Sequence, residues 1–126
     1  MILAVVEDLL FLSKIQQTAQ TTGVAVKHAR PSDLPKLAVE NLPNAIFIDL
    51  NHRSGTALEI LGTLKADPRT KDITAIGFVS HVQTDLIAAA RAAGCDLVLA
   101  RSAFSSQLPS LLQRFSGTGS TRCAAE

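Results

Sequence analysis

The sequence predicts an α/β fold in which a five-stranded parallel sheet lies between two layers of helices, a three-layer sandwich. Short apolar runs alternate with amphipathic stretches along the chain, which is typical of repeated strand–helix units. The first run, residues 2–6, contains no polar side chain, as in a central strand that is buried on both faces. With 126 residues, 47% hydrophobic and 18% charged, the chain can form one hydrophobic core and is too apolar to be disordered.

Each predicted element has its own pattern. The predicted strands are apolar or alternating runs, and they cover residues 2–6, 24–28, 45–49, 73–79 and 97–100. The predicted helices carry apolar residues every three or four positions, and they cover residues 10–22, 32–40, 56–66, 83–93 and 105–115. Gly23 and Gly94 end the first and the fourth of these helices. Ser32 or Asp33 caps the second helix, in which Pro35 falls in the first turn.

Right-handed crossovers between parallel strands leave few topologies for this sheet, and the flavodoxin-like strand order 2-1-3-4-5 is the usual one. In such a sheet the functional crevice lies beyond the carboxyl ends of the first and third strands, where the order reverses. We expect residues 1–115 to form one domain and residues 116–126, which lack apolar periodicity, to form a flexible tail. Because the five units use the chain up to the tail, we expect output through contact with another protein.

Composition excludes several classes of partner. The net charge is +1 and the chain has neither Trp nor Tyr, which argues against binding nucleic acid through phosphates or stacked bases. Glu7 and Asp8 interrupt the apolar N-terminus with no basic residue before them, and no stretch is long enough to span a membrane. Cys95 and Cys123 are too few for a disulfide scaffold. We therefore expect a cytoplasmic protein whose partners include neither a membrane nor a nucleic acid.

Three carboxylates are predicted to meet at the crevice. Glu7 and Asp8 directly follow the first strand, and Asp49 ends the third strand, its neighbour in the sheet. Like charges so close would raise one another's pKa unless a cation lies among them. Mg²⁺ suits the cluster because it takes oxygen ligands and keeps several waters. The alternative is that these residues are ordinary solvated acids at strand ends.

Five segments together form a recognisable pattern: Val5-Val6-Glu7-Asp8, Ile46-Phe47-Ile48-Asp49-Leu50-Asn51, residues 55–61, Phe78-Val79-Ser80 and Ala92-Ala93-Gly94-Cys95-Asp96. On these segments, residues 2–115 resemble the receiver domain of two-component response regulators. The resemblance implies that Asp49 accepts a phosphoryl group from a histidine kinase and that the Ser80 hydroxyl turns toward that group. It also implies a Mg²⁺ ligand set of Glu7, Asp8, Asp49 and the backbone carbonyl of Asn51.

Four features depart from the family pattern. Arg101 replaces the usual Lys after the fifth strand, and its larger, forked guanidinium could bind a phosphoryl group or pair with Asp49. Ser102 replaces the Pro that usually follows this position. The loop after Asp49 lacks the usual Met-Pro pair and is shorter than in the family. Val98 stands where a switching aromatic residue is common.

We therefore expect a receiver-like signalling domain that acts through protein–protein contacts in a two-component phosphorelay pathway. Phosphorylation at Asp49 is expected to be weak or absent because Arg101 replaces the Lys. The alternative is a working, Mg²⁺-dependent receiver that a histidine kinase phosphorylates on Asp49. The expected partner is a histidine kinase or another signalling protein. A homodimer could form through the fourth helix, the fifth strand and the fifth helix, where small residues permit close packing.

Other functions have less support from the sequence. A small α/β enzyme built on Ser80 lacks the G-x-S-x-G elbow, and we do not expect an enzyme. The acidic loop after the first strand has no glycine to hold a nucleotide phosphate. His28, His52 and His81 could join the acids in a transition-metal site, but loop histidines are the simpler interpretation. Residues 9–12, Leu-Leu-Phe-Leu, are either the inward face of the first helix or an apolar docking surface.

Overall fold

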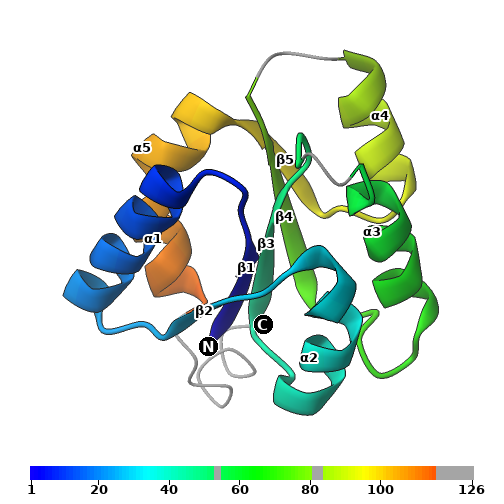
Figure 1. Cartoon of the computed structure of the whole chain (residues 1–126), viewed down its shortest axis with the longest axis horizontal. Coiled ribbons are helices and arrows are strands. Elements are labelled where there is room, and N and C mark those ends of the chain that lie inside the picture. Colours follow the sequence, from blue (N-terminus) through cyan, green and yellow to red (C-terminus); the bar gives the residue numbers. More distant parts are fainter. Residues whose placement is uncertain (53–54, 81–83, 116–126) are drawn as a thin grey trace.

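The computed structural model describes residues 1–52, 55–80 and 84–115, which form a sheet of five strands with five α-helices around it (Figure 1). In chain order the elements are β1 (Ile2–Val5), α1 (Leu9–Thr22), β2 (Val26–His28), the 3-10 helix η1 (Pro31–Asp33), α2 (Leu34–Asn41), β3 (Ala45–Asp49), α3 (Ala57–Ala66), β4 (Thr74–Val79), α4 (Thr84–Ala92), β5 (Leu97–Ala100) and α5 (Arg101–Arg114). All strands are parallel, in the order β2-β1-β3-β4-β5. The predicted fold class and the order 2-1-3-4-5 are confirmed.

The central strands are buried on both faces of the sheet. Leu3 and Val5 of β1 pack into the core that α2, α3 and α4 cover, whereas Ile2 and Ala4 pack into the core under α1 and α5. Figure 1 shows these two groups of helices on opposite sides of the sheet. This arrangement explains why β1 contains no polar residue, since neither of its faces reaches solvent.

The last helix begins earlier than the sequence predicts. α5 starts at Arg101, directly after β5 ends at Ala100, whereas the pattern indicated a start at residue 105. Ala100 has an extended backbone and no side chain that could cap the helix, so the usual start signal is missing. Ser106, at the second position of the predicted helix, donates its hydroxyl to the carbonyl of Ala103. Arg101 therefore lies in the first turn of a helix rather than in a loop.

The remaining boundaries differ little from the prediction. Gly23 ends α1 with a φ of 77°, the left-handed conformation that favours glycine. β2 begins at Val26 rather than at residue 24, because the Val24 N–H donates to the carbonyl of Ala19 and completes the end of α1. The predicted tail, residues 116–126, lies outside the described residues. Over the ranges that the structure describes, no helix is long and apolar enough to cross a bilayer.

Candidate functional site

Asp8 is the N-cap of α1 and connects this helix to β1. Its Oδ1 accepts hydrogen bonds from the backbone N–H groups of Leu10 at 2.9 Å and Phe11 at 3.3 Å. Its Oδ2 accepts a hydrogen bond at 2.6 Å from the guanidinium of Arg101, which is 93 residues away in the sequence. The Arg101 contact, with the helix amides, holds the pKa of the Asp8 carboxyl below its ordinary value.

Arg101 is held from two sides. Its guanidinium carbon lies 4.1 Å from the centroid of the Phe11 ring, so a cation–π contact adds to the ion pair with Asp8. The sequence suggested Asp49 as a partner for this guanidinium, and the structure gives Asp8 instead. The positive charge of Arg101 therefore lies at the end of β1 and the start of α1.

Asp49 ends β3 and is 6% exposed. Burial raises the pKa of its carboxyl, and hydrogen bonds from the backbone of Asn51 and of Glu7 oppose this effect. The bond from the Asn51 N–H to Oδ1 of Asp49 is 2.9 Å long. The charge of His52 lowers the same pKa and the carboxylate of Glu7 raises it. Glu7 and Asp49 therefore do converge at the carboxyl end of the sheet, as the predicted topology required.

Asn51 links the ends of β3 and β4. Its side-chain Oδ1 accepts the backbone N–H of Ser80 at 2.7 Å. The resemblance assigned a role only to the Asn51 backbone carbonyl, and no pattern in the sequence indicates the side-chain contact, since the partner is 29 residues away. Ser80 is exposed just after the end of β4. His81, the third predicted histidine, lies outside the described residues.

Four phenylalanine rings form a cluster on the α1 and α5 side of the sheet. The Phe104 ring centroid lies 4.8 Å from that of Phe78, 5.0 Å from that of Phe47 and 5.9 Å from that of Phe11. Each ring is two or three positions along the chain from a candidate site residue: Phe11 and Asp8, Phe47 and Asp49, Phe78 and Ser80, Phe104 and Arg101. The cluster therefore holds together the four elements that carry the candidate site.

The donor set at this site does not fit a divalent cation in the arrangement that the structure shows. Asp8 already accepts from two helix amides and a guanidinium, so both of its oxygens are engaged. Across residues 1–52, 55–80 and 84–115, no group of three or more His, Cys, Asp or Glu side chains is placed to hold a metal ion. The ligand set of Glu7, Asp8, Asp49 and Asn51 stays a prediction.

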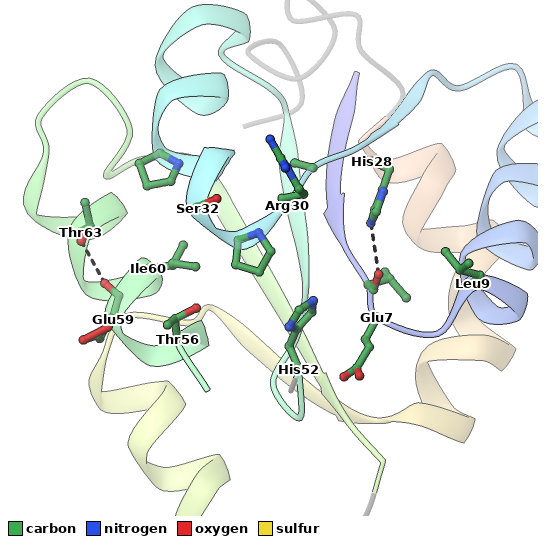
Figure 2. Close-up of a pocket in the computed structure, with 14 residues that line it drawn as sticks. Glu7, Leu9, His28, Arg30, Ser32, His52, Thr56, Glu59, Ile60 and Thr63 are labelled. Carbon is green, nitrogen blue, oxygen red and sulfur yellow. Dashed lines mark hydrogen bonds between the residues drawn. The ribbon is translucent and has the colours of Figure 1, made fainter. Parts of the chain in front are cut away.

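A cavity of about 680 Å³ opens beside the crevice, between the β2–α2 connection and α3 (Figure 2). Glu7, His28 and His52 line it, together with a mostly apolar wall. Figure 2 shows His28 pointing toward the backbone at the end of β1, where its Nε2 lies 3.1 Å from the carbonyl oxygen of Val6. A carbonyl can only accept, so this contact places a hydrogen on Nε2. No pattern in the sequence indicates this cavity, because three separate segments build its walls.

The start of α1 combines the two interpretations of residues 9–12. Phe11 and Leu12 are buried in the core under α1 and α5. Leu9 and Leu10 are 70% and 84% exposed. Phe11 and Leu12 therefore belong to the inward face of α1. Leu9 and Leu10 form an apolar patch on the surface next to Asp8.

Comparison of the sequence with protein-family models and with curated proteins finds no match. Solved structures with the same fold are found. The chemotaxis protein CheY4 of Vibrio cholerae is 19% identical, with a TM-score of 0.78 over 90% of this chain and 96% of that one. The Mn²⁺-bound form of response regulator Rcp1 is 16% identical, with a TM-score of 0.70 over 93% and 95% of the two chains.

A response regulator from Burkholderia pseudomallei, solved with a phosphorylated aspartic acid, a calcium ion and citrate, is 20% identical. Its TM-score is 0.75 over 98% of this chain and 70% of that one. At these identities the similarity shows the fold alone. The structures that this chain resembles are response regulator receiver domains, and the chain has their fold.

Proposed function

We propose that this chain is a receiver-like signalling domain that acts through protein–protein contacts in a two-component phosphorelay pathway of the cytoplasm. We further propose that phosphorylation at Asp49 is weak or absent. The fold that the chain shares with response regulators supports the signalling role. The observation that carries the second part is the 2.6 Å ion pair between Arg101 and Asp8.

The ion pair bears on phosphorylation through charge. Transfer of a phosphoryl group to Asp49 needs positive charge near the transferring oxygens, because negative charge spreads over them in the transition state. Arg101 replaces the Lys of the family, and its guanidinium is already engaged with Asp8 and with the Phe11 ring. Asp49 is also buried and accepts backbone hydrogen bonds. These contacts favour slow phosphorylation or none.

A contact role has its own support in the exposed surface. Leu9 and Leu10 place large apolar side chains in solvent beside Asp8, and neighbouring apolar side chains of this kind are typical of protein-binding surfaces. We propose a histidine kinase or another signalling protein as the partner. A homodimer through α4, β5 and α5 stays a prediction, to be checked by measuring the mass of the chain in solution.

The test of weak phosphorylation uses the purified chain, Mg²⁺ and a small phosphodonor such as acetyl phosphate, followed by intact mass measurement. We expect little or no phosphoryl adduct. The Asp49→Asn variant is the matched control, because it keeps the size of the side chain and removes the nucleophile. A stable adduct on the wild-type chain that is absent from Asp49→Asn would overturn this part of the proposal.

That outcome would favour the second candidate, a Mg²⁺-dependent receiver that a histidine kinase phosphorylates on Asp49. The position of Asp49 at the carboxyl end of β3, with Asn51 and Ser80 beside it, favours this candidate. Similar structures include one with a phosphorylated aspartic acid and calcium and one with Mn²⁺. For this candidate to hold, Asp8 would have to give up its contact with Arg101.

A further inference from the structure

We propose that Arg101 is the resident cation of this crevice: its guanidinium takes the place of a divalent metal ion at Asp8 and keeps such an ion out. The inference concerns the same crevice as the proposed function. It rests on the contacts of Arg101, and its test measures metal binding rather than phosphorylation of Asp49.

The carboxylate of Asp8 is fully engaged by groups of the chain itself. The Asp8 carboxylate is stabilised by a cation, and the guanidinium of Arg101 supplies that charge at 2.6 Å from Oδ2. Oδ1 meanwhile accepts from the first-turn amides of α1. A divalent ion on Asp8 would have to displace the guanidinium or take Oδ1 away from the helix.

Arg101 is also held on the side away from Asp8. Its guanidinium stacks 4.1 Å from the centroid of the Phe11 ring, and Phe11 itself is only 7% exposed. Phe11 in turn lies 5.2 Å from Phe78 and 5.9 Å from Phe104, so the stacking partner belongs to the fixed core. Displacing Arg101 from Asp8 would therefore break two favourable contacts.

The place of Arg101 in the fold limits how it can move. It is the first residue of α5 and follows β5 with no intervening loop. The strand and the helix fix its backbone, so the guanidinium cannot withdraw through loop movement. On the α5 side, rotation of the Arg101 side chain is therefore the movement that can uncover Asp8.

The residue type matters as well as the charge. A guanidinium is flat and wide, so it can contact a carboxylate at its edge and an aromatic ring on its face at the same time. A Lys ammonium is compact, strongly hydrated and on a flexible stem, so it covers less of the carboxylate. We therefore expect the two cations to differ in how well they exclude a metal ion.

The experiment measures Mn²⁺ binding to the full chain from the loss of the free-ion signal in electron paramagnetic resonance. The proteins are wild type, Arg101→Met, Arg101→Lys and the double variant Asp8→Asn with Arg101→Met. Methionine keeps much of the length of the side chain and removes its charge. Arg69→Met is the matched control, because Arg69 makes a similar ion pair with Asp67, at 2.9 Å and away from the crevice. Circular dichroism melting checks that each variant is folded.

We expect Arg101→Met to bind Mn²⁺ roughly tenfold more tightly than wild type, which is the change that loss of one such contact produces. Arg101→Lys should fall between the two, and Arg69→Met should match wild type. The double variant should lose the gain, which would place the ion on Asp8. Equal binding by wild type and Arg101→Met, whether tight or absent, would overturn the inference. If Arg101→Met does not fold, Mn²⁺ binding by Arg101→Lys is compared with binding by wild type instead, and equal binding would overturn the inference.

These results are independent of the phosphorylation test. The proposed function fails if an Asp49 adduct forms, and this inference fails if the metal affinity does not respond to Arg101. Each outcome can occur without the other.

Discussion

Replacing Phe104 by leucine should destabilise the domain more than the same replacement at Phe115. Both rings are buried, with exposed fractions of 0% and 6%. Phe104 lies at the centre of the four-ring cluster, whereas Phe115 has no ring partner among the described residues. The pair of variants therefore separates the contribution of ring geometry from that of ordinary packing.

The expected magnitudes follow from these contacts. Exchanging a buried Phe for Leu changes shape and volume modestly and costs about 1 kcal/mol through packing. Each aromatic pair adds about 0.5–1.5 kcal/mol beyond the area it buries, and Phe104 makes three pairs within 6 Å. Because these pairs share one ring they are not additive, so we expect Phe104→Leu to lose about 2–3 kcal/mol. A domain of this length loses about 4 °C of Tm for each kcal/mol.

Urea unfolding followed by circular dichroism, with thermal melting as a second probe, measures the two variants side by side. We expect a fall in Tm of about 8–12 °C for Phe104→Leu and of about 4 °C for Phe115→Leu. Equal losses at the two positions would refute the argument, because they would show that the ring arrangement adds nothing to packing. A loss confined to Phe115 would show that the cluster does not stabilise the site at all.

Three further predictions concern stability. Burial raises the pKa of Asp49, so the folded chain binds that proton more tightly than the unfolded chain and loses stability as pH rises through the raised pKa. Asp49→Asn should therefore be more stable than wild type at neutral pH, and urea titrations should show this advantage shrinking, not growing, on acidification. Leu42 ends α2 with a φ of 44° and is 60% exposed. Because glycine adopts this left-handed conformation without strain, Leu42→Gly should raise the free energy of unfolding in urea by about 0.5–1 kcal/mol. Leu42→Ala keeps the Cβ and should raise it little. Pro109 lies inside α5 and cannot donate to the carbonyl of residue 105, so Pro109→Ala should raise stability by about 2 kcal/mol in thermal melts; no change would mean that α5 had already adapted to the proline.

The fold could be predicted from the sequence because each strand carries a local signal. A run such as residues 45–49, four apolar residues and a terminal acid, has one stable place in a small α/β domain, the middle of a parallel sheet. The strand order then follows from general rules of handedness rather than from particular side chains. Only the start of α5 was misplaced by several residues, since Ala100 gives no cap signal there.

The candidate site could be predicted only in part, because its contacts join distant segments. The sequence places Asp8 at the end of a strand, and its role as N-cap could have been read from the apolar stretch that follows it. The partner of Arg101 could not be predicted from the sequence. The choice between Asp8 and Asp49 depends on where α5 begins and on the Phe11 ring of α1, against which the guanidinium stacks. The hydrogen bond between Asn51 and Ser80 could not be predicted either, because it joins two distant segments of the chain.

The position of Asp8 gives these observations a common cause. Two helices begin at this corner of the domain, and the positive end of the α5 dipole disfavours a cation at its first residue. Asp8 offsets that cost by pairing with Arg101, while it also accepts the first amides of α1. One carboxylate thus serves two helix starts at once, and a metal ion would compete with both. The chain therefore stabilises this corner of the crevice with its own side chains.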